Sequence, residues 1–337
     1  MTPRRPRKRP LRQDLPGEIW GVAVCFGLVG TSTWLHNLAR FSENVRAQGL
    51  KLLVVEVAAD RSPFHVGNHI ADLVVRLRAS DLMWQKERLI NLGVASLPKQ
   101  CDKVVWLDTD ILFENADWVA ETSDNLEHVP VLQPFESVYW LPRGETSPVA
   151  QPPTGMGDGC IMAGMAYAMT GVPDRRRALA DFFVHGHTGF AWAARRSLLA
   201  HHGLYDRHIL GGGDVSIAHS VFGDRDYWRG RNFFCRNMTK PEQVAVAAWG
   251  AAFHADVGEE VSFVPGRLLH LWHGALAQRG YVSRGQILKV HQFDPAIDVA
   301  IDGSGCLRWN SNKPGLHAAV RAYFASRVLG AAALVDA

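Results

Sequence analysis

The chain has 337 residues, is 47% hydrophobic and carries a formal net charge of +3 at pH 7. This length and composition suffice to bury one large α/β core or two smaller ones. Residues 1–16 hold six basic side chains against one acidic, which leaves 30 basic and 32 acidic groups in residues 17–337. That nearly neutral body has no basic stripe, so nucleic acid is not expected as a partner.

The basic, proline-rich residues 1–16 are typical of a disordered tail, which could hold the protein peripherally at a membrane. Residues 19–35 lack charge, and a basic segment followed by an apolar one is also how a secretory signal begins. Because Gly21, Gly27 and Gly30 interrupt the stretch, no transmembrane segment is expected. Five widely spaced cysteines fit a reducing compartment, so we expect a cytoplasmic protein.

The first elements follow a strand, helix, strand order. An apolar run at 20–26 predicts a strand, 33–48 a helix that Gly49 ends, and 51–57 a second apolar strand. Such a unit opens a parallel doubly wound sheet, and the sheet would lose its first strand if that segment were a cleaved signal. Further along, 82–97 predicts a helix.

The most informative stretch is an apolar strand that ends in Asp108 and Asp110. Residues two apart in a strand point the same way, so both carboxylates are expected on one side. Ligands of open α/β sheets bind at this end of a strand. Two carboxylates there predict a Mg²⁺ or Mn²⁺ site that also takes a phosphate. The alternative is an ordinary turn rich in aspartate.

Polar and aromatic side chains surround this motif in the sequence. Lys86, Arg88 and Asn91 lie on the preceding helix, where they either contact a nucleotide diphosphate or form its solvated face. Residues 133–164 read as a long loop rich in proline and glycine, and its Tyr139 and Trp140 form either a sugar platform or part of the core.

The next candidate is Asp214, which directly follows three glycines. Glycine lets the backbone approach a ligand closely, and an acid beside it could take a proton from a hydroxyl. The alternative is a glycine-rich turn with Asp214 capping a helix over 215–221.

A predicted strand over 261–274 ends in two histidines, His270 and His273. Imidazole is a natural partner for carboxylates around a divalent cation, although a lone histidine is usually structural. The sequence Arg279, Tyr281, Arg284 follows, and guanidinium groups match the oxygens of a pyrophosphate. Residues 315–333 predict an amphipathic closing helix.

Over residues 18–290 these motifs, in this order, resemble the GT-A class of nucleotide-sugar glycosyltransferases. The resemblance is to family 2-like members, with a galactosyltransferase-like Gly-Gly-x-Asp region. It rests on Arg88 and Asn91, the Asp-x-Asp motif, Gly-Phe-x-Trp-x-x-Arg before Gly-x-Tyr-Asp, Gly-Gly-x-Asp and a late histidine. It implies a Rossmann-like, mostly parallel twisted sheet flanked by helices, with a C-terminal helical extension.

The resemblance also implies roles for residues. Asp214 falls at the position of the general base of inverting members, although Gly213 stands where many relatives carry an acid. The implied metal ligands are Asp108, Asp110 and His270, for Mn²⁺ or Mg²⁺. The implied donor-binding residues are Arg88, Asn91, Asp108, Thr109, Asp110, His273, Arg279, Tyr281 and Arg284. The implied substrate-binding residues are Gly189, Phe190, Trp192, Gly212 and Gly213.

The resemblance predicts a catalytic domain over 17–290, with a nucleotide-binding part to about 130 and an acceptor part beyond it. Residues 291–337 would form an extension. The expected partners are a nucleotide-sugar donor, most commonly uridine diphosphate-linked, and a saccharide, lipid-linked or protein acceptor. Two alternatives stay open: a phosphatase of the haloacid dehalogenase type, and a sugar-nucleotide-binding module without turnover.

Overall fold

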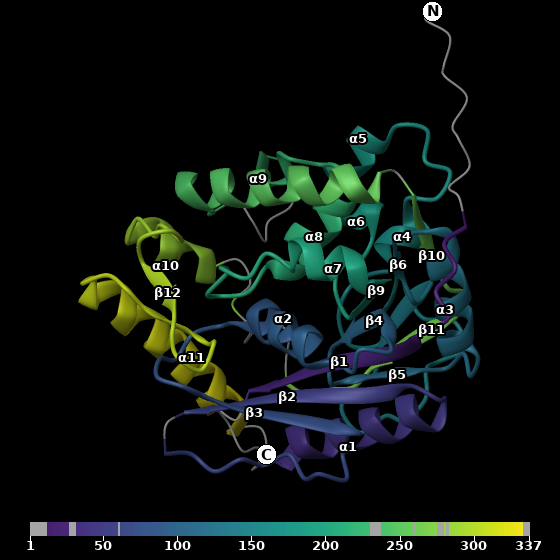
Figure 1. Cartoon of the computed structure of the whole chain (residues 1–337), viewed down its shortest axis with the longest axis horizontal. Coiled ribbons are helices and arrows are strands. Elements are labelled where there is room, and N and C mark those ends of the chain that lie inside the picture. The colour runs from purple at the N-terminus through teal and green to yellow at the C-terminus, as the bar shows by residue number, and fades with distance from the viewer. Residues whose placement is uncertain are drawn as a thin grey trace, which may run out of the picture.

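The computed structural model describes residues 12–26, 32–59, 61–229, 237–258, 260–274, 280 and 283–332. A seven-stranded sheet flanked by helices forms its centre, which confirms the predicted α/β class (Figure 1). The strand order is β10 (Val261–Phe263), β6 (Val131–Gln133), β9 (Ala191–Arg195), β4 (Cys101–Leu107), β1 (Glu18–Phe26), β2 (Lys51–Ala59) and β3 (Leu73–Ala79). Strand β9 runs antiparallel to both neighbours, and the other pairings are parallel.

The winding of the chain creates a switch point between β1 and β4. From β1 the chain moves outward to β2 and β3, and it returns through α2 (Lys86–Ser96) to β4 on the other side of β1. Open sheets bind ligands beyond the carboxyl ends of the strands at such a point. Asp108 directly follows β4 and therefore lies at this position.

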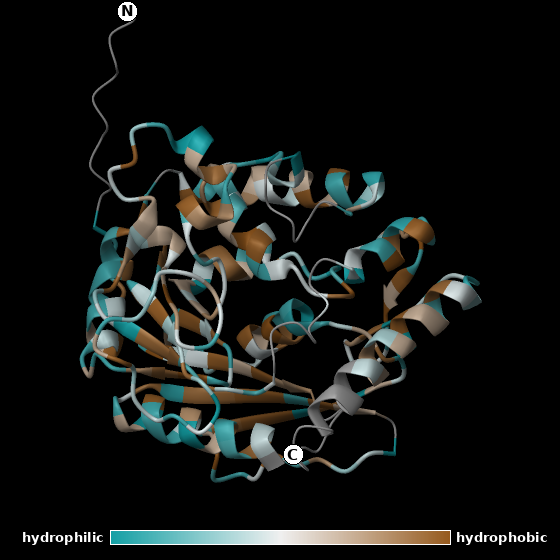
Figure 2. Cartoon of the chain, turned by 180° about the vertical axis from the view of Figure 1, so that it is seen from behind, coloured by the Kyte–Doolittle hydropathy of each residue, from teal (hydrophilic) through white to brown (hydrophobic). Residues whose placement is uncertain are grey.

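Alternating side chains of the central strands build one hydrophobic core on each face of the sheet. Val54 and Leu107 pack in the core that includes α1 (Ser32–Ala47). Leu53 and Trp106 pack in the other core, together with α2. Figure 2 shows the central strands largely in the hydrophobic colour. Strands buried on both faces need such continuous apolar runs, which is why the sequence revealed them.

Further helices cover the sheet and the end of the molecule. Helices α7, α8 and α9 form a layer on the side of α2 that faces away from β2 (Figure 1). The bounds are α3 (Trp118–His128), α4 (Met165–Ala168), α5 (Arg175–Leu179), α6 (Phe182–His185), α7 (Arg196–His202), α8 (Gly213–Val221), α9 (Lys240–Val257), α10 (Arg284–Val290) and α11 (Pro314–Ala332). Helix α11 agrees with the expected closing helix.

A second, four-stranded sheet was not expected. It consists of β5 (Ile111–Phe113), β11 (Arg267–His270), β7 (Ser137–Trp140) and β8 (Ile161–Ala163). Because β7 and β8 belong to it, the prediction of one long loop over 133–164 is wrong. Tyr139 and Trp140 are buried in this region, so they are core residues and not an exposed sugar platform.

The predicted strand over 261–274 is in fact two strands in different sheets, and the second ends at His270. Strand β10 pairs with β6 in the central sheet, whereas β11 pairs with β5 and β7. The break falls at Pro265 and at Gly266, whose φ of 120° favours glycine. This break carries His270 to the edge where β4 ends.

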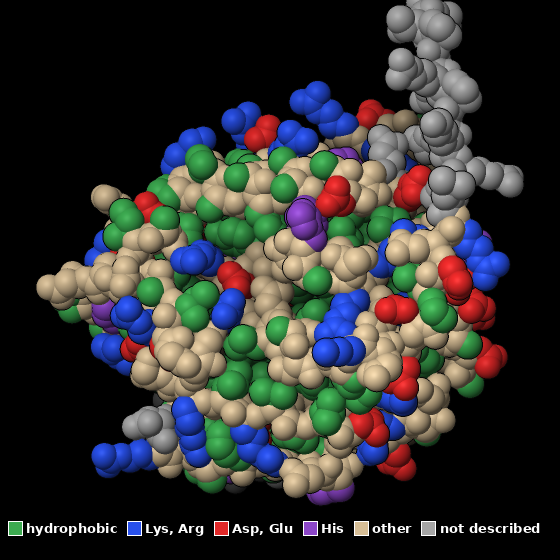
Figure 3. All heavy atoms as spheres, viewed as in Figure 1, with side chains coloured by type: hydrophobic (Ala, Val, Ile, Leu, Met, Phe, Trp, Pro, Cys, Tyr) green, Lys and Arg blue, Asp and Glu red, His purple; other side chains and the backbone are tan. Residues whose placement is uncertain are grey.

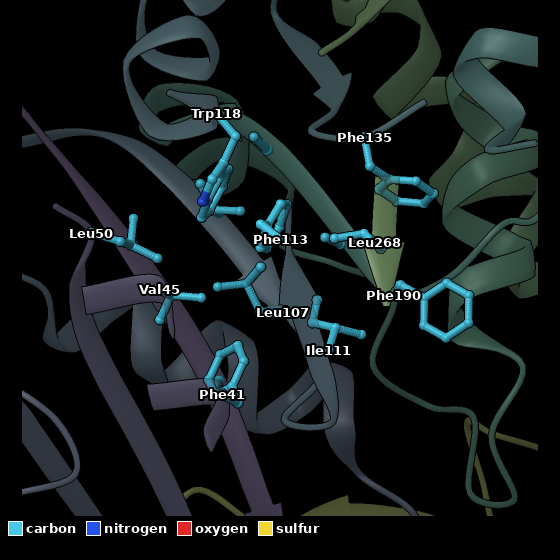
Figure 4. Packing of buried hydrophobic residues seen from close by; sticks show 14 of the residues in the cluster. Phe41, Val45, Leu50, Leu107, Ile111, Phe113, Trp118, Phe135, Phe190 and Leu268 are labelled. Carbon is cyan, nitrogen blue, oxygen red and sulfur yellow. The ribbon is translucent and has the colours of Figure 1, made fainter. Parts of the chain in front are cut away.

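A buried cluster of large side chains supports the turn that contains the two aspartates (Figure 4). Leu107 and Ile111, on either side of the turn, are both buried in it. In the same cluster Phe113 stacks on Trp118, with ring centroids 3.7 Å apart and planes inclined by 4°. The turn is therefore held at both ends by side chains that cannot leave the core without large loss of buried area.

The C-terminal segment packs as a separate cluster. Helices α10 and α11 and the two-stranded sheet of β12 (Val299–Ile301) and β13 (Leu307–Trp309) gather at one end of the molecule (Figure 1). Their apolar side chains pack against Met83 and Ile209. The proposed division at about residue 290 stays a prediction.

The surface and the helices add two observations. On the face seen in Figure 3, basic and acidic side chains are interspersed and form no continuous basic stripe. Among the described residues, no helix is both long and apolar enough to cross a bilayer.

The contact between α2 and the sheet depends on the missing side chain of Gly93. A Cβ there would lie 2.6 Å from Cγ1 of Val22 and 3.0 Å from Cγ2 of Val55. We predict that Gly93→Ala lowers the free energy of unfolding by about 1 to 3 kcal/mol, measured by urea denaturation. This overpacking outweighs the gain of about 1 kcal/mol that alanine brings to a helix.

Gly303→Ala is the matched control, because a Cβ at Gly303 would meet no atom within 4 Å. Its free energy of unfolding is expected to stay within about 0.5 kcal/mol of wild type. Equal stability of Gly93→Ala and Gly303→Ala would contradict the close packing of α2 on β1 and β2.

Candidate functional site

A buried lysine joins three segments that are far apart in the sequence. Lys86, the first residue of α2, places Nζ 2.5 Å from Oδ1 of Asp108 and 3.0 Å from Oδ1 of Asp214. Asp108 belongs to the turn after β4, and Asp214 to the first turn of α8. We call Lys86, Asp108 and Asp214 the lysine cluster. It fixes the position of Asp214 relative to the end of the central strand.

The lysine cluster is strongly coupled. Burial by itself would lower the pKa of Lys86, but Asp108 and Asp214 outweigh it and raise that pKa well above its usual value. Burial raises the pKa of Asp108 to about 7, since the carboxylates of Asp214 and Asp110 add to it while Lys86 opposes it. Removing the ammonium would leave these carboxylates facing each other in a poorly solvated site.

Asp214 has the exposure that a proton acceptor needs. Its side chain is 34% exposed, and it makes no cap hydrogen bond, because Gly212 is the N-cap of α8. One carboxylate oxygen contacts Lys86. The other, Oδ2, lies against the backbone of Gly189, where a Cβ would be 3.2 Å from it. The glycine at 189 therefore leaves room for this carboxylate.

A second group, the histidine cluster, consists of Asp110, His270 and His273. Nε2 of His273 lies 2.9 Å from Oδ2 of Asp110, Nε2 of His270 lies 3.7 Å from the same oxygen, and the two nitrogens are 3.2 Å apart. His270 ends β11, and Asp110 precedes β5, so the pairing of these two strands brings the cluster together.

The histidine cluster has the donor set and the spacing of a transition-metal site. Ligand atoms that share one such ion at about 2.0 to 2.2 Å lie roughly 3 to 3.5 Å from one another. The three separations of 2.9, 3.2 and 3.7 Å lie around this range. Aromatic side chains close one side, since the ring of Phe190 lies 5.2 Å from that of His270. The residues present therefore fit a divalent cation.

The two aspartates of the strand-end motif turn to different neighbours. Asp108 contacts Lys86, whereas Asp110 contacts the two histidines. Strand β4 ends at Leu107, so the rule for alternating strand side chains no longer holds at 108–110. The expectation that both carboxylates face one side is therefore wrong. Thr109, between them, is half-buried. Asp108 as a metal ligand stays a prediction.

Arg88 and Asn91 point away from both clusters. Arg88 donates to Oδ2 of Asp206 at 3.2 Å and to the carbonyl of Gly305 at 2.6 Å. Asn91 donates to the carbonyl of Leu204 at 2.9 Å. These residues lie three apart on one face of α2 and brace the Gly-x-Tyr-Asp turn. Their bonds give them a structural role, and contact with a nucleotide remains untested.

The aromatic candidates divide into one at the site and one in the core. Trp192 is buried in β9, and its Nε1 donates to the carbonyl of Thr188 at 2.8 Å. Substrate contact by Trp192 is therefore excluded in this arrangement. Phe190 has a φ of 75°, unusual for a bulky residue, and stacks on His187 with centroids 4.1 Å apart. Such strain tends to occur at functional sites.

Of the predicted pyrophosphate clamp, only Arg284 can be placed. Arg279 and Tyr281 lie outside the described residues. The guanidinium of Arg284 lies over the glycine-rich turn, since a Cβ on Gly211 would be 3.1 Å from its Nη1. Gly211 and Gly212 have φ values of 86° and 107°, so this turn needs glycine for its conformation.

Sequence reasoning missed Glu87 and His187. Glu87 is 2% exposed, and burial, then the charge of Asp214, raise its pKa to about 8. Nδ1 of His187 accepts the backbone N–H of Gly189 at 3.1 Å. The sequence contained one signal for Glu87, namely the absence of a side chain at Gly213, but only the fold shows that the two positions meet.

No protein-family model matches the chain, and no curated protein matches it. Several solved structures align with it at low identity. A mycobacterial protein is 13% identical over 88% of this chain and 84% of that chain, with a TM-score of 0.40. Glucosyl-3-phosphoglycerate synthase from Mycobacterium tuberculosis, in complex with Mg²⁺ and uridine diphosphate, is 12% identical over 82% and 79%, with a TM-score of 0.38.

The catalytic domain of Drosophila beta-1,4-galactosyltransferase 7, in complex with xylobiose, is 13% identical over 72% of this chain, with a TM-score of 0.31. The alignment spans 64% of that structure's chain. With scores this low, the likeness carries no argument about activity. The functional conclusion must therefore rest on the two clusters.

The raised pKa of Glu87 predicts a pH-dependent contribution to stability. The folded protein holds this proton up to about pH 8, whereas an unfolded chain releases it near pH 4.3. The folded state thus binds more protons in this window, so the free energy of unfolding falls as pH rises through it. Glu87→Gln removes this loss, and its Tm relative to wild type is expected to rise by several degrees from pH 5 to pH 9 in chelator.

Glu43→Gln, at an exposed position on α1, is the control for loss of a carboxylate. Its Tm difference from wild type should not change with pH in the same window. A constant difference for Glu87→Gln as well would show that Glu87 carries no shifted proton.

Proposed function

We propose that the chain is a metal-dependent glycosyltransferase that moves a sugar from a nucleotide diphosphate donor to an acceptor hydroxyl. One observation carries the proposal. At the switch point of the sheet, the histidine cluster lies two residues along the chain from the lysine cluster, which holds the exposed carboxylate of Asp214. A site for a cation and a proton acceptor are thus side by side, which suits departure of a diphosphate and attack by a hydroxyl.

On the donor side, Asp110, His270 and His273 would hold the cation, with Asp108 as a further candidate. The bound cation supplies positive charge to a departing diphosphate. Two imidazoles in the set favour Mn²⁺ over Mg²⁺, which prefers oxygen ligands. Arg284, which lies over the glycine-rich turn, would bind the same phosphates, because a guanidinium forms paired hydrogen bonds with phosphate oxygens.

On the acceptor side, Asp214 would take the proton of the attacking hydroxyl. Lys86 holds one of its oxygens and fixes its orientation, and the exposed part of the carboxylate faces the reacting hydroxyl. Attack on the face opposite the diphosphate gives an inverted product, with Asp214 protonated at the end of the step. We further propose a uridine diphosphate hexose as donor, which makes the chain a hexosyltransferase, and a saccharide, lipid-linked or protein acceptor.

The two alternatives predict different products. A phosphatase of the haloacid dehalogenase type would use Asp108 as nucleophile and release inorganic phosphate from a monoester. In the structure Asp108 and Asp214 share the ammonium group of Lys86. A binding module without turnover would bind the donor and release nothing. Product analysis therefore separates all three.

We expect uridine diphosphate to raise the Tm by several degrees in the presence of Mn²⁺, less with Mg²⁺, and not at all with chelator. Asp110→Asn should abolish the Mn²⁺-dependent part of this rise in Tm, because it removes the charged ligand that contacts both histidines. Asp117→Asn, an exposed aspartate at the start of α3, serves as control and should keep the shift. No shift with any nucleotide and metal would overturn the proposal.

Asp214→Asn is expected to slow release of uridine diphosphate from the donor by about 10² to 10⁴-fold, because the general base is lost. Binding of uridine diphosphate and Mn²⁺ should remain. The measurement is a coupled assay of uridine diphosphate release from UDP-glucose and UDP-galactose, with parallel detection of inorganic phosphate from a phosphate monoester. Phosphate release without nucleotide release would favour the phosphatase.

A further inference from the structure

Glu87 occupies the space that a side chain at position 213 would fill. A Cβ built on Gly213 would lie 2.0 Å from Oε1 and 2.2 Å from Cδ of Glu87. Such distances are far below any contact between real atoms, so a side chain at position 213 would require the Glu87 side chain to leave the place that it occupies here.

At position 213 glycine is needed because a side chain would lack space, and not because the backbone conformation requires it. Its neighbours Gly211 and Gly212 have φ values of 86° and 107°, which a side chain tolerates poorly. Gly213 is the first residue of α8 and does not have a positive φ. Its lack of a side chain is therefore explained by Glu87, which reaches it from the first turn of α2.

The carboxyl group of Glu87 borders the lysine cluster. It follows Lys86 directly, and among charged neighbours Asp214 has the largest effect on its pKa, which it raises. Glu87 is only 2% exposed, and its Oε2 has no hydrogen-bond partner among the residues that the structure describes. A buried carboxyl oxygen without a partner is costly, so a site at which it persists calls for an explanation.

We propose that Glu87 is a positioning residue of the acceptor side, which supplies from α2 a second carboxyl group beside Asp214 in the place of a side chain at 213. The proposal rests on the proposed transferase function. Glu87 acts through Asp214 and, given its burial, does not touch the substrate. Its side chain packs against Gly213 and so keeps the neighbouring Asp214 in contact with Lys86.

The protonation of Glu87 is consistent with this role. Its pKa of about 8 keeps the carboxyl neutral at pH 7. A neutral acid leaves the ammonium of Lys86 to Asp108 and Asp214, whereas a third anion would compete for it. Glu87 can thus sit behind the base without adding a negative charge at the point where the hydroxyl attacks.

The test transfers the carboxyl group from position 87 on α2 to position 213 on α8. We compare Glu87→Ala, Gly213→Glu and the double variant Glu87→Ala/Gly213→Glu, with Glu87→Gln as the conservative replacement. For each protein we measure Tm, binding of uridine diphosphate with Mn²⁺, and the kcat of uridine diphosphate release from a UDP-hexose. Water serves as the acceptor, so no acceptor sugar is needed.

Glu87→Ala is expected to bind uridine diphosphate as wild type does, while kcat falls about 10- to 100-fold because Asp214 is misplaced. Gly213→Glu should lower the Tm through overpacking. The double variant should regain both the Tm and most of the kcat. Glu87→Gln keeps the shape of a neutral acid and should lose less than about threefold in kcat at pH 7.

Two outcomes would overturn the proposal. One is a double variant that regains Tm while its kcat stays at the level of Glu87→Ala, since this would make Glu87 a filler of space only. The other is an unchanged kcat in Glu87→Ala. If the double variant fails to fold, equal losses in Glu87→Gln and Glu87→Ala also overturn it, and loss in Glu87→Ala alone supports it. Failure of the proposed function is distinct, because wild type itself would then neither bind nor release uridine diphosphate.

Discussion

The site depends on one buried ammonium group. Lys86 reaches Asp108 after the central strand and Asp214 at the start of α8, so one side chain joins the end of β4 to the helical layer that includes α8. Without this cation the two carboxylates would repel each other, and α8 would lose its tie to the end of β4. The ammonium of Lys86 is buried, while the carboxylates of Asp108 and Asp214 are partly exposed. The chief effect of this ion pair is therefore on the geometry of the site, and what it adds to overall stability is smaller.

The histidine cluster depends on hydrophobic packing behind it. The turn that carries Asp110 is short, and its flanking residues Leu107 and Ile111 are fixed in the core that Trp118 closes. The pairing of β5 with β11 then brings His270 to the same turn. Two polar ligands from distant parts of the chain thus meet because apolar side chains determine where both strands lie.

Glycines shape the surroundings of Asp214 in two different ways. Gly211 and Gly212 adopt backbone conformations that other residues avoid, whereas Gly213 makes room for Glu87. A carboxyl group from α2 can therefore reach the start of α8, and the missing side chain of Gly213 is the counterpart of Glu87. The same reasoning applies to Gly189, whose missing side chain leaves space for Asp214.

The sequence by itself determined the central strands β1, β2 and β4, because strands buried on both faces must be continuously apolar. It did not reveal β3, β6 or β9 of the same sheet. It also singled out Asp110, Asp214 and the late histidines, since chemistry of this kind needs those side chains. Only the tertiary structure decided which of them meet. It broke the predicted strand at Pro265, buried Trp192, and turned Arg88 toward Asp206. It also revealed Glu87. Such facts depend on distances between segments remote in sequence, and local periodicity carries no information about those distances.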